Sequence, residues 1–92
     1  MIKSFKHKGL ELFFTTGSAR GIDSKQAVKI RERLSLLDTA QNIDDMDIPA
    51  LKLHSLKGKR AGQWSITVTG NWRIVFEFID GDAYIVNYED YH

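Results

Sequence analysis

The sequence predicts an α+β domain with two N-terminal helices packed on one face of an antiparallel three-stranded meander, and a short N-terminal edge strand beside it. Apolar residues at helical spacing precede residue 38, whereas β-branched and aromatic runs follow residue 62, separated by Gly70-Asn71 and Asp80-Gly81. A chain of 92 residues is long enough to bury one core and too short for a second. We therefore interpret residues 1–92 as a single domain.

The first helix is predicted by three apolar residues at the spacing of one helical face: Leu10, Phe13 and Phe14. Gly17 follows them as a typical helix stop. Residues 2–5 precede this helix and are expected to form the edge strand. His7 lies between two lysines, so we interpret it as a solvated surface residue.

The second helix is expected to begin at an N-cap, Asp23 or Ser24, with Gln26 at capping-box spacing from Asp23. Its apolar stripe consists of Ala27, Ile30, Leu34 and Leu37. A basic ridge recurs every four residues on another face and consists of Lys25, Lys29 and Arg33. Such a ridge is often only a solvated surface. Residues 38–50 contain the only proline and lack periodicity, so we expect a linker with at most one helical turn.

The register of the first two strands follows from keeping their apolar residues together. A two-residue loop at Gly70-Asn71 would split the apolar set between the two faces, whereas a three-residue loop closed by a bulge would unite it. We therefore predict the loop Thr69-Gly70-Asn71. The expected core face consists of Trp64, Ile66, Val68, Trp72, Ile74, Phe76 and Phe78. The opposite, open face consists of Ser65, Thr67, Thr69, Arg73, Val75 and Glu77.

The register of the last strand depends on the turn at Asp80-Gly81. A two-residue turn would place Arg73 opposite Tyr88, with Asp90 and His92 following on the open face. Strict alternation would then direct Tyr91 to the other face. The last residues would thus meet Arg73 across a strand pair, in a concavity that the helices leave open.

Composition excludes several classes of protein. The chain has no cysteine, which excludes disulfides, thiolate metal sites and cysteine nucleophiles. It contains no apolar run long enough for a membrane span and no apolar segment typical of a cleavable signal, so we expect a cytoplasmic protein without membrane contact.

Charge is segregated along the chain although the net charge is only +1. Residues 48–76 contain five bases and no acid, and residues 77–92 contain five acids. This pattern indicates a surface for a polyanion, or else a solvated basic loop. Gly58 and Gly62 flank Lys59 and Arg60, which we expect to form a mobile basic hairpin or turn that suits phosphates.

The residues available for chemistry are a few histidines, acids and a phenol. The three histidines lack the spacing of a helical metal pair, so no metal site is predicted. In "LKLHSLKGKR" the leucines are expected to face the core while His54 and Lys57 point away, although a packed or capping histidine fits equally well. RNA cleavage needs removal of a 2′-OH proton, neutralisation of the phosphorane and protonation of the leaving oxygen. Imidazole suits both proton transfers, and Lys or Arg suits the phosphate.

The stretch "KLHSLKGKRAGQWSITVTGNWRIVFEFIDGDAYIVNYEDYH" resembles the HigB branch of the RelE-type toxins, and the opening "MIKSFKHKGL" resembles the start of that branch. The resemblance implies the RelE-like microbial RNase fold. It also implies a toxin of a type II toxin–antitoxin pair that cuts mRNA in the ribosomal A site. Such enzymes use the 2′-OH as nucleophile and need neither a metal nor another cofactor.

The resemblance assigns catalytic roles to His54, Asp90, Tyr91 and His92. The resemblance implies that Lys57 and Arg73 occupy basic positions that face the RNA. We expect Lys59 and Arg60 to bind RNA as well. Many distant relatives have a basic residue where this chain has Ser65. Strand alternation would place Tyr91 on the face opposite Asp90 and His92, whereas the resemblance requires all three near the RNA. We therefore expect the strand to end or bulge around Asp90. The alternative is that Tyr91 stacks on the RNA from an edge of the sheet.

The resemblance also implies three partners: mRNA in the A site, ribosomal RNA, and a cognate HigA-like antitoxin with a helix-turn-helix domain. Two other functions fit the same fold. Related toxins poison DNA gyrase, and a non-catalytic RNA- or protein-binding module would use the C-terminal residues only to complete the sheet.

Overall fold

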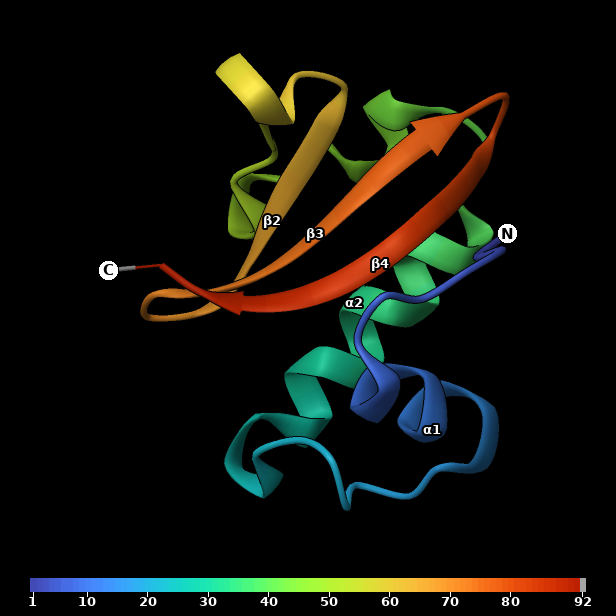
Figure 1. The fold of residues 1–92 in the computed structure, drawn as a ribbon, viewed down its shortest axis with the longest axis vertical. Helices are drawn as coiled ribbons and strands as arrows, with labels where there is room; N and C mark the ends of the chain where they lie inside the picture. The colour runs from blue at the N-terminus through green and yellow to red at the C-terminus, as the bar shows by residue number, and fades with distance from the viewer. Residues whose placement is uncertain (92) are drawn as a thin grey trace.

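A computed structural model describes residues 1–91, and it places the helices on one face of a four-stranded antiparallel sheet with the order β1-β2-β3-β4 (Figure 1). The helices and strands are α1 (Lys8–Thr16), α2 (Ala27–Thr39), β1 (His54–Ser55), β2 (Gln63–Thr69), β3 (Trp72–Ile79) and β4 (Asp82–Asp90). The α+β class and the meander are therefore confirmed. Within the described part of the chain, no helix is both long and apolar enough to cross a membrane.

The first helix begins and ends as its sequence predicts. At its start the ring of His7 accepts a hydrogen bond at Nδ1 from the Leu10 amide, 3.1 Å away, and at its end Gly17 takes a left-handed φ of 82°. The interpretation of His7 as a solvated residue was wrong. The ring is half-buried, and burial lowers the pKa of His7 below its ordinary value because a charged ring would lose water there.

The second helix is entered through a short 3-10 turn, η1 (Ser24–Gln26), capped by the Asp23 carboxylate, which accepts a hydrogen bond from the Lys25 amide at 2.9 Å. The predicted capping box is absent from this turn. Gln26 is instead buried, and its side-chain oxygen accepts a hydrogen bond from the Tyr88 hydroxyl. The start of α2 is thereby tied to the last strand.

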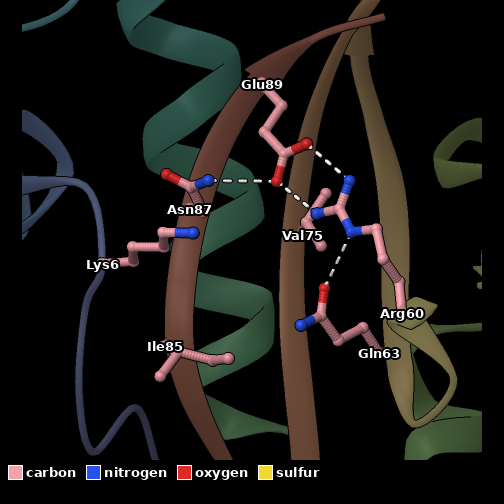
Figure 2. Close-up of a pocket in the computed structure, with 7 residues that line it drawn as sticks. All are labelled: Lys6, Arg60, Gln63, Val75, Ile85, Asn87 and Glu89. Carbon is pink, nitrogen blue, oxygen red and sulfur yellow. Dashed lines mark hydrogen bonds and ion pairs between the residues drawn. The ribbon is translucent and has the colours of Figure 1, made fainter.

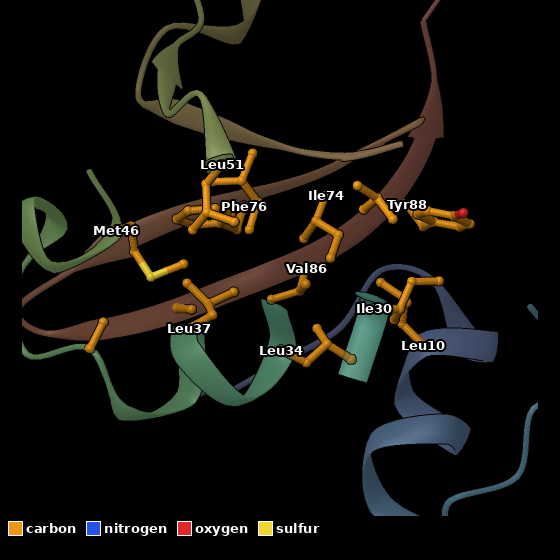
Figure 3. Close-up of a cluster of buried hydrophobic side chains, with 14 of the residues drawn as sticks. Leu10, Ile30, Leu34, Leu37, Met46, Leu51, Ile74, Phe76, Val86 and Tyr88 are labelled. Atoms are coloured by element: carbon orange, nitrogen blue, oxygen red, sulfur yellow. The ribbon is translucent and has the colours of Figure 1, made fainter. Parts of the chain in front are cut away.

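A single core lies between the helices and the sheet (Figure 3). From the helices it receives Leu10, Phe13, Ile30, Leu34 and Leu37. From the strands it receives Ile66, Val68, Ile74, Phe76, Ala83, Val86 and Tyr88. The linker contributes Met46 and Leu51 through two 3-10 turns, where the sequence predicted at most one: η2 (Ile43–Met46) and η3 (Pro49–Leu51). Each fully buried large apolar side chain contributes about 1.5–3 kcal/mol.

The predicted N-terminal edge strand forms only two isolated parallel bridges with β4, Ile2 to Ala83 and Phe5 to Val86. Figure 1 shows this segment running beside β4. The fourth strand of the sheet is instead β1, which pairs with β2 at the opposite edge. The sheet thus has His54 at one edge and the N-terminal segment at the other.

The predicted faces of β2 and β3 are confirmed except at Thr69, which was expected on the open face but pairs with Trp72 on the helix-covered side. Trp64 pairs with Phe76 and Ile66 pairs with Ile74, so the apolar residues of both strands lie on the helix-covered face. The extra residue sits elsewhere than predicted: Thr69 pairs with Trp72 across a two-residue turn, and the register shifts within β2 between Thr67 and Thr69.

The predicted pairing of Arg73 with Tyr88 was wrong, because β4 contains a β-bulge. The two-residue turn at Asp80-Gly81 forms as expected, but Ile85 and Val86 together oppose the single residue Phe76. Ile85 adopts a left-handed φ of 47°. Beyond it Arg73 pairs with Glu89, and the side chains that alternation had assigned to one face lie on the other.

The N-terminal segment holds this bulge in place. The Ser4 hydroxyl accepts a hydrogen bond from the Ile85 amide at 2.8 Å, and the Ser4 carbonyl accepts one from the Val86 amide at 3.1 Å. The Val86 carbonyl accepts a hydrogen bond from the Lys6 amide at 2.9 Å. The amides of Ile85 and Val86 and the carbonyl of Val86 are satisfied in this way.

Substituting Ser4→Ala is therefore expected to lower the free energy of unfolding by about 1 kcal/mol, because it removes one hydrogen bond from the strained bulge. Urea denaturation would measure the change, with Ser18→Ala, in the loop after α1, as the matched control. Equal stability of the two variants would contradict the role of the Ser4 hydroxyl.

Candidate active site on the open face of the sheet

The face of the sheet without helices presents rows of paired side chains, and two of these rows hold the residues of the candidate site. One row runs from His54 through Ser65 and Val75 to Asn87. The other row consists of Thr67, Arg73 and Glu89. Residues paired across antiparallel strands point to the same side, so both rows belong to this open face. The bulge in β4 brings Asn87 and Glu89 here.

Arg60 reaches across the open face. It ends a 3-10 turn, η4 (Gly58–Arg60), that precedes β2, yet its guanidinium forms a two-pronged ion pair with Glu89 on β4. The NH1 to Oε1 distance is 2.8 Å, and Nε donates to the Gln63 side-chain oxygen at 3.2 Å. The arginine stem therefore passes over β2 and β3, which accounts for the burial of Ser65 and Val75 on a face without helices.

This contact shifts the charges of both partners. The hydrogen bond from Arg60 is the main cause that holds the pKa of Glu89 below its ordinary value, and the Asn87 amide, which donates to Glu89 at 3.0 Å, adds to it. The same hydrogen bond raises the pKa of the Arg60 guanidinium above its ordinary value, and the charge interaction with the Tyr91 phenol raises it further. Figure 2 shows the group in a pocket of about 530 Å³, lined by Lys6, Arg60, Gln63, Val75, Ile85, Asn87 and Glu89.

Arg73 and Tyr91 form the second feature of this face. The Arg73 guanidinium carbon lies 5.6 Å from the centre of the Tyr91 ring. NH1 of Arg73 donates to the carbonyls of Gly70 at 2.7 Å and Trp72 at 3.1 Å, so turn backbone holds the guanidinium. The Tyr91 amide donates to the Asn71 carbonyl at 2.8 Å, which fixes the chain beyond β4. The structure thus unites these two predicted site residues.

Asp90 does not share the open face, contrary to the prediction. It pairs with Trp72, whose ring stacks on Tyr88 at 4.6 Å on the helix-covered side. The pKa of Tyr88 is raised to about 12, chiefly by burial and then by the charges of Asp23 and Asp90. The strand was expected to end or bulge around Asp90, and the first alternative is confirmed, because β4 ends at that residue. His92 lies outside the described residues.

His54 is exposed in the edge strand β1, on the open face. Lys57, which precedes η4, and Lys59, which lies within it, are both exposed. His54 lies in the row of Val75, so it is roughly 10 Å from Arg73 across the sheet and a further two residues, roughly 7 Å, along the strand direction. The structure therefore places His54 on the face of Arg73 and Tyr91 without bringing it into their group.

The predicted basic ridge of α2 is shorter than expected. Lys25 and Lys29 are exposed. Arg33 instead donates through Nε to the Thr67 carbonyl at 3.0 Å, and only 11% of its side chain is exposed. Arg33 is therefore a structural contact between α2 and β2.

Sequence reasoning missed Glu89, Asn87, Gln63 and Lys6. A signal was present in β4, because the strict register would have placed Asn87 opposite Ile74 in the core. The requirement that apolar residues share one face, which we used for β2 and β3, would therefore have predicted a bulge in β4 as well.

Among known proteins, the family model described as the RelE-like toxin of the type II toxin-antitoxin system HigB matches residues 3–92. Endoribonuclease HigB of Proteus vulgaris is 56% identical over 92 residues, covering 100% of both chains. Toxin HigB-1 of Vibrio cholerae serotype O1 is 34% identical over 85 residues, covering 90% of each. A chain of the YoeB-YefM complex from Staphylococcus aureus covers 100% of this chain and 95% of its own with a TM-score of 0.65; at 20% identity it shows the fold alone.

The lowered pKa of Glu89 predicts a dependence of stability on acidity. Because folding favours the charged carboxylate, the stabilisation is fully present above the ordinary pKa of 4.5 and is lost as the pH falls through the folded-state value. The free energy of unfolding of Glu89→Gln should therefore change less than that of the wild type between about pH 6 and pH 3. Urea titrations across this range would measure it, with Glu11→Gln, on the exposed side of α1, as control. Parallel profiles for wild type and Glu89→Gln would refute the ion pair.

Proposed function

The chain belongs to the HigB-like family of RelE-like toxins of type II toxin–antitoxin systems, and we propose that it is an endoribonuclease that cleaves translated mRNA in the ribosomal A site. The observation that supports this most is the contact of Arg73 with Tyr91 on an open face that also carries His54. This face combines a fixed cation, a phenol and an imidazole without a covering helix. An extended RNA strand can reach all three.

The proposed reaction begins with attack of a ribose 2′-OH on the adjacent phosphorus. The 2′-proton leaves to a base, the bond from phosphorus to the 5′-oxygen breaks, and that oxygen takes a proton from an acid. The products are a 2′,3′-cyclic phosphate and a 5′-hydroxyl, and the reaction needs no metal or cofactor. His54 and His92 share the two proton transfers, since imidazole both gives and accepts protons near neutrality.

Arg73 and Lys57 hold the scissile phosphate and stabilise its additional charge. The carbonyls of Gly70 and Trp72 orient Arg73 in advance, so little reorganisation is needed when charge develops. Tyr91 stacks on, or hydrogen-bonds to, the nucleotide beside that phosphate. Asp90, at the end of β4 on the side of Trp72, orients an imidazole from the rim of the face.

The remaining exposed bases supply contacts without sequence preference. Lys59, Lys25 and Lys29 bind phosphates of ribosomal RNA in this proposal, whereas Arg33 is excluded by its contact with Thr67. Membership of a type II family further implies an antitoxin, which we propose to be a HigA-like helix-turn-helix protein.

Arg73→Ala is expected to lower the rate of message cleavage on programmed ribosomes by roughly 10²- to 10³-fold, because it removes charge stabilisation from the transition state. His54→Ala should lower the same rate by roughly 10²- to 10⁴-fold through loss of one proton transfer. Single-turnover cleavage of a labelled message at saturating protein would measure both, with Lys3→Ala, an exposed base of the N-terminal segment, as control.

Wild-type activity in a folded Arg73→Ala or His54→Ala variant would reject the assigned roles. If the wild type leaves translated messages intact and instead causes DNA breaks or a supercoiling defect, the chain is a gyrase poison. Binding of RNA without any cleavage would indicate a non-catalytic module.

A further inference from the structure

Arg60 was expected to bind RNA phosphate, but its surroundings suit a different contact. Its guanidinium donates through Nε, NH1 and NH2 to the side chains of Gln63 and Glu89. These acceptors fix the guanidinium plane, and the carboxylate compensates its charge. A phosphate would have to compete with Glu89 for the same cation, whereas the flat surface of the guanidinium is not used by these bonds.

The pocket around this plane offers both apolar walls and groups for hydrogen bonding. Ile85 contributes an apolar surface from the bulge, where the residue has a left-handed backbone and is 37% exposed, and Val75, which is only 2% exposed, lines the pocket from β3. Figure 2 shows Lys6 and Asn87 on the opposite side of the pocket from Gln63. Asn87 uses its amide nitrogen for Glu89, so its oxygen can accept, while Gln63 uses its oxygen for Arg60, so its nitrogen can donate.

The pocket adjoins the proposed cleavage site. Glu89 is the cross-strand partner of Arg73, and Tyr91, whose ring lies over Arg73, follows Glu89 by two residues on the same face. A volume of about 530 Å³ lies within the range of small-molecule pockets. An RNA strand that places a phosphate at Arg73 would therefore bring a neighbouring nucleotide to this pocket.

We propose that the pocket binds one unpaired nucleobase next to the scissile phosphate, stacked on the Arg60 guanidinium that Glu89 holds flat. Bases splayed from single-stranded RNA stack on arginine planes as they do on aromatic rings. The Asn87 oxygen, the Gln63 amide nitrogen and the Lys6 ammonium contact the edge of the base. Arg60 is thus a binding residue for a base, and Glu89 is its positioning residue. This inference rests on the proposed RNA cleavage.

The two uses of Arg60 predict opposite effects of Glu89→Gln. If Arg60 is a stacking platform, loss of the two-pronged ion pair loosens the plane and raises the protein concentration needed for half-maximal cleavage. If Arg60 grips a phosphate, the substitution unmasks a cation, lowers that concentration and steepens its salt dependence. Arg60→Lys retains the charge and removes the plane, so it should weaken binding only in the first case.

The test uses ribosomes programmed with short synthetic messages, each carrying one abasic nucleotide next to the cleavage site. For the wild type, one abasic position should raise the half-saturating concentration by roughly 5- to 100-fold, with the cleavage rate at saturation nearly unchanged. For Arg60→Lys, the unmodified message should already show this increase, and the abasic message should add little. Arg20→Lys, in the exposed loop before α2, is the matched control, and thermal melts establish that each variant is folded.

An equal abasic penalty in wild type and folded Arg60→Lys would overturn the base pocket, as would tighter binding by Glu89→Gln. Absence of any penalty in the wild type would overturn it as well. These results differ from failure of the proposed function, in which the wild type would not cleave even the unmodified message.

Discussion

The β-bulge at Ile85 is the constraint on which the rest of the structure depends. It places two residues of β4 opposite one of β3, so every later side chain of the strand changes face. Val86 and Tyr88 enter the core, while Asn87 and Glu89 reach the open face. A β-branched residue in a left-handed conformation costs about 1–2 kcal/mol. The hydrogen bonds that Ser4 accepts from the Ile85 and Val86 amides, and the burial of Val86 and Tyr88, offset that cost.

The bulge also determines the electrostatics of the open face. Once Glu89 points outward it lies within reach of Arg60, and the ion pair withdraws one cation from what the sequence presents as a uniformly basic segment. The Arg73 guanidinium is held instead by the carbonyls of Gly70 and Trp72. The face therefore divides into a cationic part at Arg73 and a charge-compensated part at Arg60. Such a division suits a polymer whose phosphates and bases alternate.

Much of the fold could be predicted because local chemistry and burial agree there. Gly17 ends α1, Asp23 caps the entry to α2, and the apolar residues of β2 and β3 require one common face. The register of the last strand was predicted wrongly, because a turn fixes the register only as far as the next bulge. Ile85, where the bulge lies, is not one of the residue types that usually indicate an irregular backbone. The contact of Arg60 was not predicted for another reason. A long side chain can bind a partner on a distant strand, and the spacing of residues along the chain does not indicate such a pair.

The end of β4 is held from both sides of the sheet, which bears on how a catalytic group so near the C-terminus could be positioned. On the helix side, Tyr88 donates to Gln26 at the start of α2 and stacks on Trp72. On the open side, Glu89 binds Arg60 and the ring of Tyr91 lies over Arg73. Catalytic side chains must hold their geometry within a fraction of an ångström, and terminal segments usually fray. Because successive residues are anchored on opposite sides of the sheet, the strand end can neither rotate nor shift freely. The contacts that complete the core therefore also hold the proposed site in position.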